Sequence, residues 1–417
     1  MTTAEMVKQT GADYDVAAVR RDFPILSREV YGKPLVYLDN GASAQKPQAV
    51  IDRISKAYSE EYANVHRGLH FLSNLATDNF EAARETVRRF LNAGSSDEIV
   101  FTRSSTEAIN LVAQSFGGMR IGEGDEIVVT QLEHHSNIVP WHFHRERRGA
   151  VLKWVKVDDE GALSLEAFEA ELTDRTKMVA ITHMSNVTGT VVPIKEICRI
   201  AHARGIPVLV DGSQAAVHMP VDVQDLDCDF YAFTGHKLYG PTGIGVLYGK
   251  KALLADMPPY LGGGEMVGEV SEDRITYAGL PHRFEAGTPP IVQAIGLAAA
   301  IDYVEALGRD RIAAHEARLK DYAHERLAHI NSVRIIGTTP DKGAIVSFEV
   351  KGTHAHDVST VMDRFGVAVR AGTHCAQPLL ARFGVTSTCR ASFGLYNTME
   401  EVDRLAESIE KACEFFA

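Results

Sequence analysis

Ala232-Phe233-Thr234-Gly235-His236-Lys237-Leu238-Tyr239 is the stretch that decides the fold of this 417-residue chain. Its first residues belong to an apolar run, Phe230 to Phe233, which predicts a buried strand. A glycine-containing turn and Lys237 follow directly. Burial lowers the pKa of a lysine amine and makes it nucleophilic, so Lys237 is placed to form a Schiff base with an aldehyde.

A carboxylate precedes this lysine by one predicted strand. Val208-Leu209-Val210 is another apolar run, and it ends in Asp211. Pyridoxal phosphate (PLP) requires both groups, a lysine on its aldehyde and a carboxylate on its pyridinium nitrogen. Each residue alone is weak evidence, but the pair in this order predicts a PLP site.

Seven short apolar runs predict one sheet, and helical patterns such as Glu107 to Ser115 and Ile194 to Arg204 separate most of them. The runs are Ile99 to Thr102, Ile127 to Thr130, Val151 to Val157, Met178 to Thr182, Pro207 to Asp211, Phe230 to Phe233 and Gly245 to Tyr248. Continuous apolar strands that alternate with helices indicate a mainly parallel α/β sheet covered on both faces. Ligands of such sheets bind at the carboxyl ends of the strands.

Polar residues follow several of these strands. Ser104-Ser105-Thr106 opens a helix after the first strand, and free N–H groups and hydroxyls at such a position bind phosphate. His134 follows the second strand and is suited to stack on a cofactor ring or to transfer protons. Asn186 and Gln214 bring amides to the same zone. Each has an ordinary structural alternative, such as a plain helix cap.

The C-terminal part reads as a smaller α+β domain that begins after a segment rich in glycine and proline and contains a predicted strand from Val367 to Arg370. We expect an N-terminal segment packing with the small domain over residues 1–30, a large domain over 31–290 and the small domain over 291–417. The small domain carries Arg370-Ala371-Gly372-Thr373-His374-Cys375, where cations near a thiol raise its thiolate fraction. Arg390, in the next predicted strand, is suited to bind a carboxylate through two parallel hydrogen bonds.

Composition narrows the class of protein. Hydrophobic residues make up 45% and charged residues 24%, and the net charge of −12 argues against binding to nucleic acid or to an anionic membrane. No apolar run approaches the length of a membrane span, and the polar N-terminus predicts a cytoplasmic protein. The five cysteines form no CxxC pair, so no metal site and no disulfide framework are expected.

Taken together, these motifs resemble the SUF-type (group II) cysteine desulfurases, which are similar to selenocysteine lyases and belong to the PLP-dependent class V aminotransferases. The resemblance covers nearly the whole chain. Besides the stretches around Lys237, Asp211 and Cys375, it is carried by Tyr37-Leu38-Asp39-Asn40, Asn64-Val65-His66-Arg67-Gly68, Thr106-Glu107-Ala108-Ile109-Asn110, Glu133-His134-His135-Ser136-Asn137, Ser185-Asn186-Val187 and Phe284-Glu285-Ala286-Gly287-Thr288. It implies PLP fold type I, with a mainly parallel seven-stranded sheet in the large domain.

The resemblance also implies roles for individual residues. Lys237 binds the cofactor covalently and carries protons, Asp211 holds the pyridinium nitrogen, Gln214 bonds the phenolic oxygen and His134 stacks on the ring. Phosphate contacts are implied for Ser105, Thr106, Thr234 and His236, joined by Thr288 of a second subunit in a homodimer. The substrate residues implied are Asn186, Arg370 and Arg390. Cys375 accepts sulfur from L-cysteine as a persulfide, which leaves L-alanine.

Two further expectations concern the loop from Ala371 to Gln377, which carries Cys375 and is called the cysteine loop below. A sulfur-acceptor protein of the SUF system for iron–sulfur cluster assembly is implied as partner, and His356 is a candidate for contacting it. Thr373 departs from many relatives, which carry a second histidine there, so the tuning of Cys375 is open.

Two alternatives remain from the sequence. Another class V enzyme, such as an aminotransferase or a kynureninase-like hydrolase, needs no nucleophilic thiol. A non-catalytic binding or assembly module of the same fold has no need of Lys237 or Asp211, and this chain has both.

Overall fold

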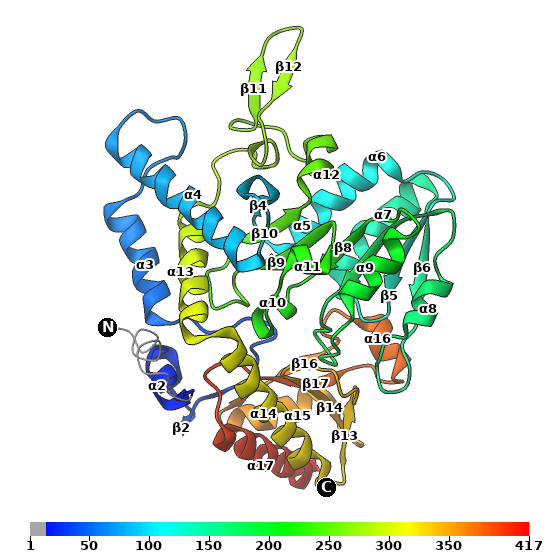
Figure 1. The fold of residues 1–417 in the computed structure, drawn as a ribbon. Coiled ribbons are helices and arrows are strands. Elements are labelled where there is room, and N and C mark those ends of the chain that lie inside the picture. Colours follow the sequence, from blue (N-terminus) through cyan, green and yellow to red (C-terminus); the bar gives the residue numbers. More distant parts are fainter. Residues whose placement is uncertain (1–13, 417) are drawn as a thin grey trace.

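The seven apolar runs predicted as strands form one sheet in the computed structural model, which describes residues 14–416 (Figure 1). Their order across the sheet is β4-β10-β9-β8-β7-β5-β6. The strands are β4 (Ile99–Thr102), β5 (Glu126–Thr130), β6 (Val151–Val155), β7 (Thr176–Thr182), β8 (Val208–Asp211), β9 (Phe230–Thr234) and β10 (Gly245–Gly249). Strands β6, β5, β7, β8 and β9 are parallel, and β10 runs antiparallel to both of its neighbours. The mainly parallel seven-stranded sheet is therefore confirmed.

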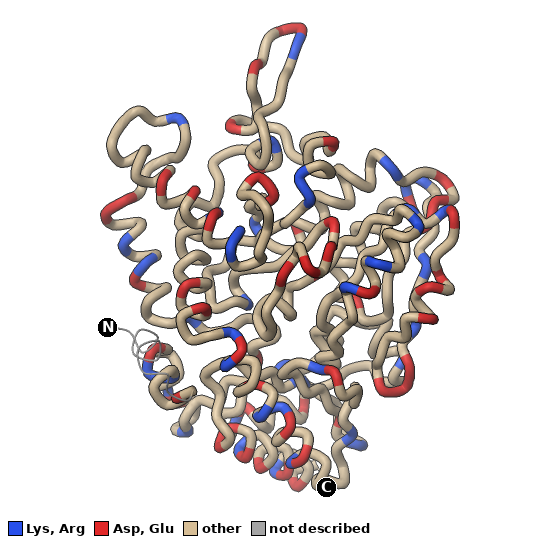
Figure 2. Tube along the Cα trace, viewed as in Figure 1, with Lys and Arg blue, Asp and Glu red and all other residues tan. Residues whose placement is uncertain are grey.

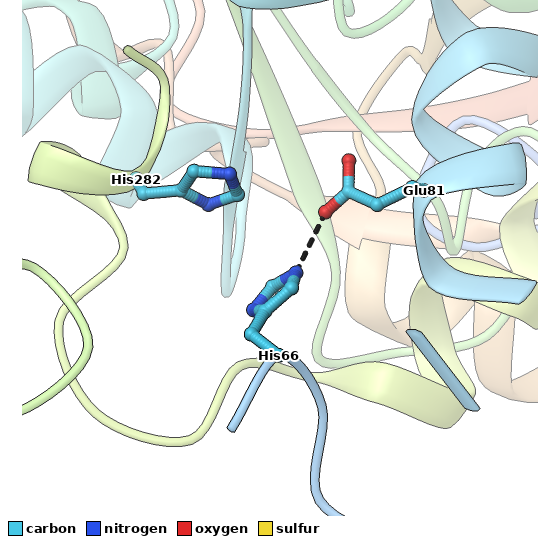
Figure 3. Close-up of side chains that lie close together, drawn as sticks. All are labelled: His66, Glu81 and His282. Atoms are coloured by element: carbon cyan, nitrogen blue, oxygen red, sulfur yellow. Dashed lines mark hydrogen bonds and ion pairs between the residues drawn. The ribbon is translucent and has the colours of Figure 1, made fainter. Parts of the chain in front are cut away.

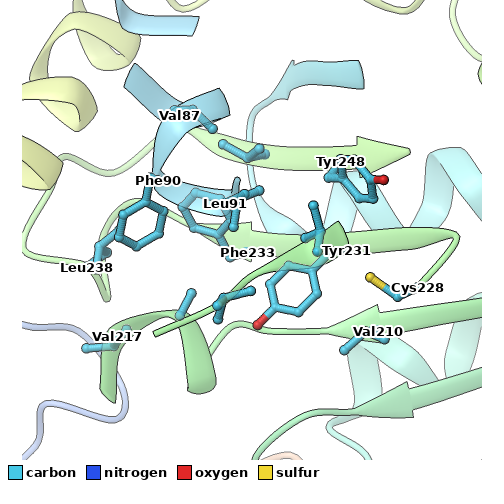
Figure 4. Packing of buried hydrophobic residues seen from close by; sticks show 14 of the residues in the cluster. Val87, Phe90, Leu91, Val210, Val217, Cys228, Tyr231, Phe233, Leu238 and Tyr248 are labelled. Carbon is cyan, nitrogen blue, oxygen red and sulfur yellow. The ribbon is translucent and has the colours of Figure 1, made fainter. Parts of the chain in front are cut away.

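Side chains of these strands alternate between two hydrophobic cores. Val208 and Val210 of β8 belong to one core, whereas Leu209 between them belongs to the other. Helices cover both cores, which explains why the strands are mostly apolar, with charged residues such as Glu126, Lys153 and Lys177 in β5, β6 and β7. In the first core, Val87, Phe90 and Leu91 pack near Phe233 (Figure 4).

Helices of this part of the chain lie on the two faces of the sheet. They are α3 (Gln48–Glu60), α4 (Phe71–Leu91), α5 (Ser105–Leu111), α6 (Gly118–Arg120), α7 (Val139–Arg148), α8 (Leu165–Ala170), α9 (Ile194–His202), α10 (Ala215–His218), α11 (Val223–Leu226), α12 (Lys251–Asp256) and α13 (Ile291–Leu307). Helix α5 continues as a π-helix over Val112–Gly117, at the end of the helix predicted from Glu107 to Ser115. Helix α4 begins at Phe71, because His70 caps it by accepting from the backbone N–H of Ser73.

A second, antiparallel sheet forms near the C-terminus in the order β13-β14-β17-β16. Its strands are β13 (Val333–Ile336), β14 (Ile345–Val350), β16 (Arg370–Gly372) and β17 (Thr388–Ser392). Helices α14 (Arg309–Ala328), α15 (Ala355–Arg364) and α17 (Met399–Phe416) accompany it, and α16 (Gln377–Arg382) follows the cysteine loop. The α+β character predicted for this part is confirmed.

One predicted strand is divided in two. The run Val367 to Arg370 forms β15 (Val367–Ala368), which pairs in parallel with β3 (Val36–Tyr37), and then β16, which pairs with β17. Val36 and Leu38 consequently lie in the core of the second sheet. Asp39 thereby reaches the second sheet, where it forms an isolated bridge with Ser392.

Smaller elements complete the description. Helix α2 (Val16–Arg21) follows the undescribed residues 1–13, and Arg20 on it bonds Tyr396 O at 2.8 Å and Glu401 at 3.0 Å. Strands β1 (Glu29–Val30) and β2 (Lys33–Pro34) form a short hairpin, and β11 (Val267–Val270) and β12 (Ile275–Tyr277) form a longer one that projects from the molecule (Figure 1).

Charges of both signs are interspersed along the whole described chain (Figure 2). Among residues 14–416, a single helix with the length and hydropathy of a bilayer span does not occur. Helices α13 and α14 together have the length and hydropathy of a span, but a bend of 78° separates them.

Candidate active site

Lys237 lies at the carboxyl end of β9, in a turn that only glycine permits at position 235. A Cβ on Gly235 would lie 2.6 Å from Ile244 Cγ2 and 3.1 Å from the carbonyl oxygen of Pro241. Burial lowers the pKa of Lys237 to about 8, an effect that Asp211 opposes and Arg390 reinforces. The amine therefore has a substantial neutral fraction near pH 8 and is suited to nucleophilic attack.

Asp211 is buried at the end of the neighbouring strand β8. Its Oδ1 accepts from the backbone N–H of Ser213 at 3.0 Å and from the Ser213 hydroxyl at 2.6 Å. These bonds fix the orientation of the carboxylate. The Gln214 side chain lies in the same cavity, and its Nε2 donates to the carbonyl oxygen of Gly41 at 2.8 Å.

One cavity of about 430 Å³ unites nearly all the predicted site residues. Its walls include Ser105, Thr106, His134, Asn186, Asp211, Gln214, Thr234, His236, Lys237, Arg370, Cys375 and Arg390. Thr288 is the exception, because it lines a separate cavity of about 410 Å³ together with Arg103 and Glu107. The predicted residues thus converge within one chain, apart from the one that was assigned to a second subunit.

His134 presents a neutral ring to the cavity. Burial, followed by the charge of Lys237, lowers its pKa to about 4. Nδ1 accepts from the backbone N–H of Ser136 at 3.1 Å and lies 2.8 Å from the Ser136 hydroxyl. The proton of the neutral ring is consequently on Nε2. A neutral, fixed imidazole can stack on an aromatic cofactor.

Glu133 fixes the segment that carries His134 by hydrogen bonds to the residues around it. The sequence analysis did not predict this role. Its fully buried carboxylate accepts from Thr130 Oγ1 and Asn137 Nδ2, both at 2.7 Å, and from the backbone N–H of Thr182 at 3.0 Å. Burial nevertheless raises the pKa of Glu133 to about 8. The sequence feature that could have indicated this role is a glutamate shortly after a predicted buried strand.

The side chain of Cys375 is exposed, whereas the backbone of the cysteine loop is anchored by hydrogen bonds. His374 and Cys375 both have left-handed backbones, with φ of 51° and 55°. Asn186 Nδ2 donates to the carbonyl oxygen of His374 at 2.8 Å, and the N–H of His135 donates to that of Cys375 at 2.7 Å. The Cys375 side chain remains exposed. Burial, then the charge of Arg390, lowers the pKa of His374 to about 3, so its ring adds no positive charge near the thiol at neutral pH.

The second sheet and the segment after β3 contribute two arginines and one aspartate to the site: Arg370, Arg390 and Asp39. Arg370 and Arg390 face each other across β16 and β17, and Asp39 bonds both, at 2.8 Å to Arg370 Nη2 and 3.3 Å to Arg390 Nη2. Arg390 is buried, and its Nη1 donates to the carbonyl oxygen of Asn186 at 2.9 Å. Asp39 was not predicted as a site residue, although it stands in one of the quoted motifs.

Three buried polar atoms of this site have no partner within the described chain: Asn186 Oδ1, His374 Nδ1 and Arg390 Nε. Buried polar groups are normally hydrogen-bonded, so these atoms indicate a polar ligand. Arg390 Nε is a cationic donor and suits a carboxylate.

Comparison with known proteins agrees with this geometry. The family model for class V aminotransferases matches residues 36–405. A probable cysteine desulfurase from Halalkalibacterium halodurans is 52% identical over 399 residues, which cover 95% of this chain and 98% of the relative. The chain belongs to the cysteine desulfurases of the class V aminotransferase family.

Other members of the family support the same assignment. A probable cysteine desulfurase from Mycolicibacterium paratuberculosis is 50% identical over 96% of this chain, but the chain spans only 58% of that relative. The crystal structure of the cysteine desulfurase CsdA (S-sulfonic acid) from Escherichia coli superposes with a TM-score of 0.90 at 42% identity, covering 97% of this chain and all of the other. The fold, the enzyme class and the PLP cofactor expected from the sequence are thereby confirmed.

The residues present fit PLP. The cavity brings a lysine amine of lowered pKa, a fixed carboxylate, a neutral imidazole and several hydroxyls to one place. These are the groups that the aldehyde, the ring nitrogen, the ring face and the phosphate of the cofactor require.

Proposed function

We propose that this enzyme converts L-cysteine to L-alanine and retains the sulfur as a persulfide on Cys375. The observation that supports this best is the place of the thiol: Cys375 lines the same cavity as Lys237 and Asp211. The other cysteines are Cys198, Cys228 and Cys389, which are buried elsewhere, and the half-buried Cys413.

The cofactor is proposed to be held by Lys237 at its aldehyde and by Asp211 at its ring nitrogen. His134 would stack on the ring, and Gln214 would bond the phenolic oxygen. Hydroxyls of Ser105, Thr106 and Thr234, with His236, would hold the phosphate. When bound, PLP supplies an electron sink for charge that develops on the substrate carbon.

Arg390 is proposed to bind the substrate carboxylate through its unpartnered Nε. Asn186 offers an acceptor, since Oδ1 has no partner while Nδ2 bonds the loop. Arg370, at the mouth of the site, adds positive charge and is held by Asp39. These contacts orient the substrate with its thiol toward Cys375.

Proton and sulfur movements then fall to two side chains. Lys237 Nζ, once free, takes the α-proton of the substrate, since its pKa of about 8 makes the neutral amine accessible. The Cys375 thiolate attacks the substrate sulfur, so that a sulfur–sulfur bond forms as the carbon–sulfur bond breaks. The electron pair of the broken bond goes to the substrate Cβ, which is protonated, and Lys237 returns a proton to Cα to give alanine.

Sulfur leaves, we propose, to an acceptor protein that reaches the exposed Cys375, in iron–sulfur cluster assembly. His356 lies beside this loop, with Nε2 3.8 Å from where a Cβ of Gly372 would be, and is proposed to contact the acceptor. Activity on selenocysteine is proposed as well, because selenium can leave the substrate without a thiol nucleophile.

A homodimer is proposed to complete the phosphate site. Thr288 faces a cavity other than the one around Lys237 of its own chain, which suits a residue that serves a second copy. The division into residues 1–30, 31–290 and 291–417 also stays a proposal, and the cytoplasmic location stays a prediction. The buried core around the second sheet comes from residues 319–412 apart from Val36 and Leu38, which supports a separate small domain. Phe23 and Leu297 belong to the core around the first sheet, so that core extends across the proposed boundaries.

The test is to mix pure protein with L-cysteine and to measure alanine and protein-bound persulfide together. Equal amounts of both, with persulfide on Cys375, support the proposal. If a Cys375→Ser variant kept full turnover, another class V chemistry would be favoured. The same assay with selenocysteine measures the second activity.

A further inference from the structure

Three potential metal ligands converge outside the active-site cavity. His66 lies in the loop between α3 and α4, Glu81 on α4, and His282 on the short helix η5 (His282–Phe284). Their ligand atoms all lie within 4.8 Å of one another, and Figure 3 shows the three side chains directed toward one space. We propose that His66, Glu81 and His282 bind one divalent transition-metal ion of the Zn²⁺ class.

The chemistry of the set fits such an ion. Two imidazoles and one carboxylate are borderline ligands that suit Zn²⁺ and not the hard cation Mg²⁺.

Neighbouring groups hold the ligands in place. Arg84 Nε donates to Glu81 Oε2 at 2.8 Å and its Nη2 donates to Oε1 at 3.3 Å, while Oε1 also lies 2.9 Å from His66 Nε2. A metal ion on Oε1 would therefore replace the longer of the two Arg84 bonds and leave the shorter one in place. Glu285 Oε2 lies 4.0 Å from His282 Nδ1, and a carboxylate near a ligating histidine is a usual second partner.

The charge around the cluster also permits a cation. Glu81, Glu285 and Glu265 face it together with Arg84 and Arg67. The three carboxylates and two guanidinium groups sum to one negative charge, which a bound cation would offset.

An open side remains for a fourth ligand. A cavity of about 320 Å³ borders the cluster and is lined by His66, Arg67, Glu265 and His282, among others. Three protein ligands with one free position form a common arrangement for Zn²⁺. The ion would join the loop before α4 to the segment that leads to Thr288. The sequence predicts no metal site because these ligands share no local spacing.

The experiment titrates Zn²⁺ into the chelator-treated holoenzyme by calorimetry, and Co²⁺ by visible absorption. Both are done in a Cys375→Ser background, so that the exposed thiol cannot bind metal. We expect one equivalent to bind, with at least tenfold weaker affinity in His282→Gln and in His66→Gln. Mg²⁺ serves as the hard-cation control.

A matched variant is His142→Gln, because His142 also pairs with a carboxylate, Glu146, at 3.2 Å, but belongs to no such cluster. It should bind Zn²⁺ as the parent does. Retained cofactor colour shows that a variant has folded, and either ligand variant alone suffices for the test. Absence of stoichiometric binding in the parent, or equal affinity in the parent and a folded ligand variant, overturns the proposal.

Discussion

The backbone N–H of His135 donates a 2.7 Å hydrogen bond to the carbonyl oxygen of Cys375. This bond ties the cysteine loop, which leads out of the second sheet, to the segment that follows β5 and carries His134. The N–H of Gln377 adds a 3.3 Å bond to His135 Nε2. A loop anchored in this way moves its tip by only a few residue lengths, about 3.5 Å each. Cys375 is therefore expected to receive sulfur beside the cofactor and to keep it until an acceptor arrives.

Lys237→Ala should abolish turnover and the colour of the lysine-bound cofactor. The phosphate and ring contacts remain, so the variant should still hold PLP non-covalently. Absorbance spectra and phosphate analysis after gel filtration measure both properties. Lys251→Ala, at an exposed lysine paired with Asp97, is the control and should behave as wild type. Unchanged activity of the Lys237 variant would end the PLP account.

Asp211→Ala should lower kcat by several orders of magnitude. Without the carboxylate, the ring nitrogen loses the charge that keeps it protonated, and the electron sink fails. Steady-state alanine production measures the effect. A loss below about tenfold, roughly 1.4 kcal/mol, would place the required carboxylate elsewhere.

Arg390→Lys should raise KM for L-cysteine more than it lowers kcat. The guanidinium uses Nη1 for Asn186 O and Nη2 for Asp39 and keeps Nε for a ligand, and a single ammonium cannot serve these three directions. Initial rates over a range of L-cysteine concentrations measure the two constants. Arg404→Lys, at a surface arginine that bonds two backbone carbonyls, is the control. Wild-type kinetics in the Arg390 variant would mean that other groups hold the carboxylate.

Acid should destabilise the protein partly through His183. Burial lowers the pKa of His183 from 6.5 to about 4. Between these values the unfolded chain binds more protons than the folded one, so the free energy of unfolding falls as pH falls from about 6.5 to about 4. One such group contributes at most about 1.4 kcal/mol per pH unit.

Urea unfolding of His183→Gln across this pH range measures that contribution. The variant should depend on pH less steeply than wild type, while His329→Gln, at an exposed histidine, should keep the wild-type slope. Equal slopes in all three proteins would contradict a neutral, buried His183.

Local patterns predicted most of the fold and of the site. The strands that end at Asp211 and Thr234 are hydrophobic up to their last residue because both faces of the sheet are covered, and that pattern is visible in the sequence. The division between β15 and β16 was missed, since it depends on β3, which is far away in the chain. The support that Glu133 gives to His134 arises from tertiary contacts and has no sequence signature of its own.

Asp39 illustrates the same limit within the site. Its motif was recognised, but its bonds to Arg370 and Arg390 exist only because β3 packs beside the second sheet. Strands joined across long stretches of sequence create such contacts. A single sequence read by local patterns does not contain them.

Sulfur and selenium substrates should respond differently to loss of the thiol. Cys375→Ala should abolish sulfur release from cysteine and spare much of the activity on selenocysteine, because selenium can leave without a nucleophile. In the presence of a thiol reductant, hydrogen sulfide or selenide and alanine are measured in parallel. Equal losses with both substrates would make Cys375 a generally required or structural residue.

The central claim is tested most directly by a rapid-mixing experiment with L-cysteine in the absence of an acceptor. Alanine is followed in time, and the mass of the peptide that contains Cys375 is measured at each point. The account predicts a burst of about one alanine per active site, matched by one additional sulfur atom on Cys375, and then slow turnover because thiol exchange depends on access. Alanine that accumulates without sulfur on Cys375, or a burst that persists in Cys375→Ser, would contradict it.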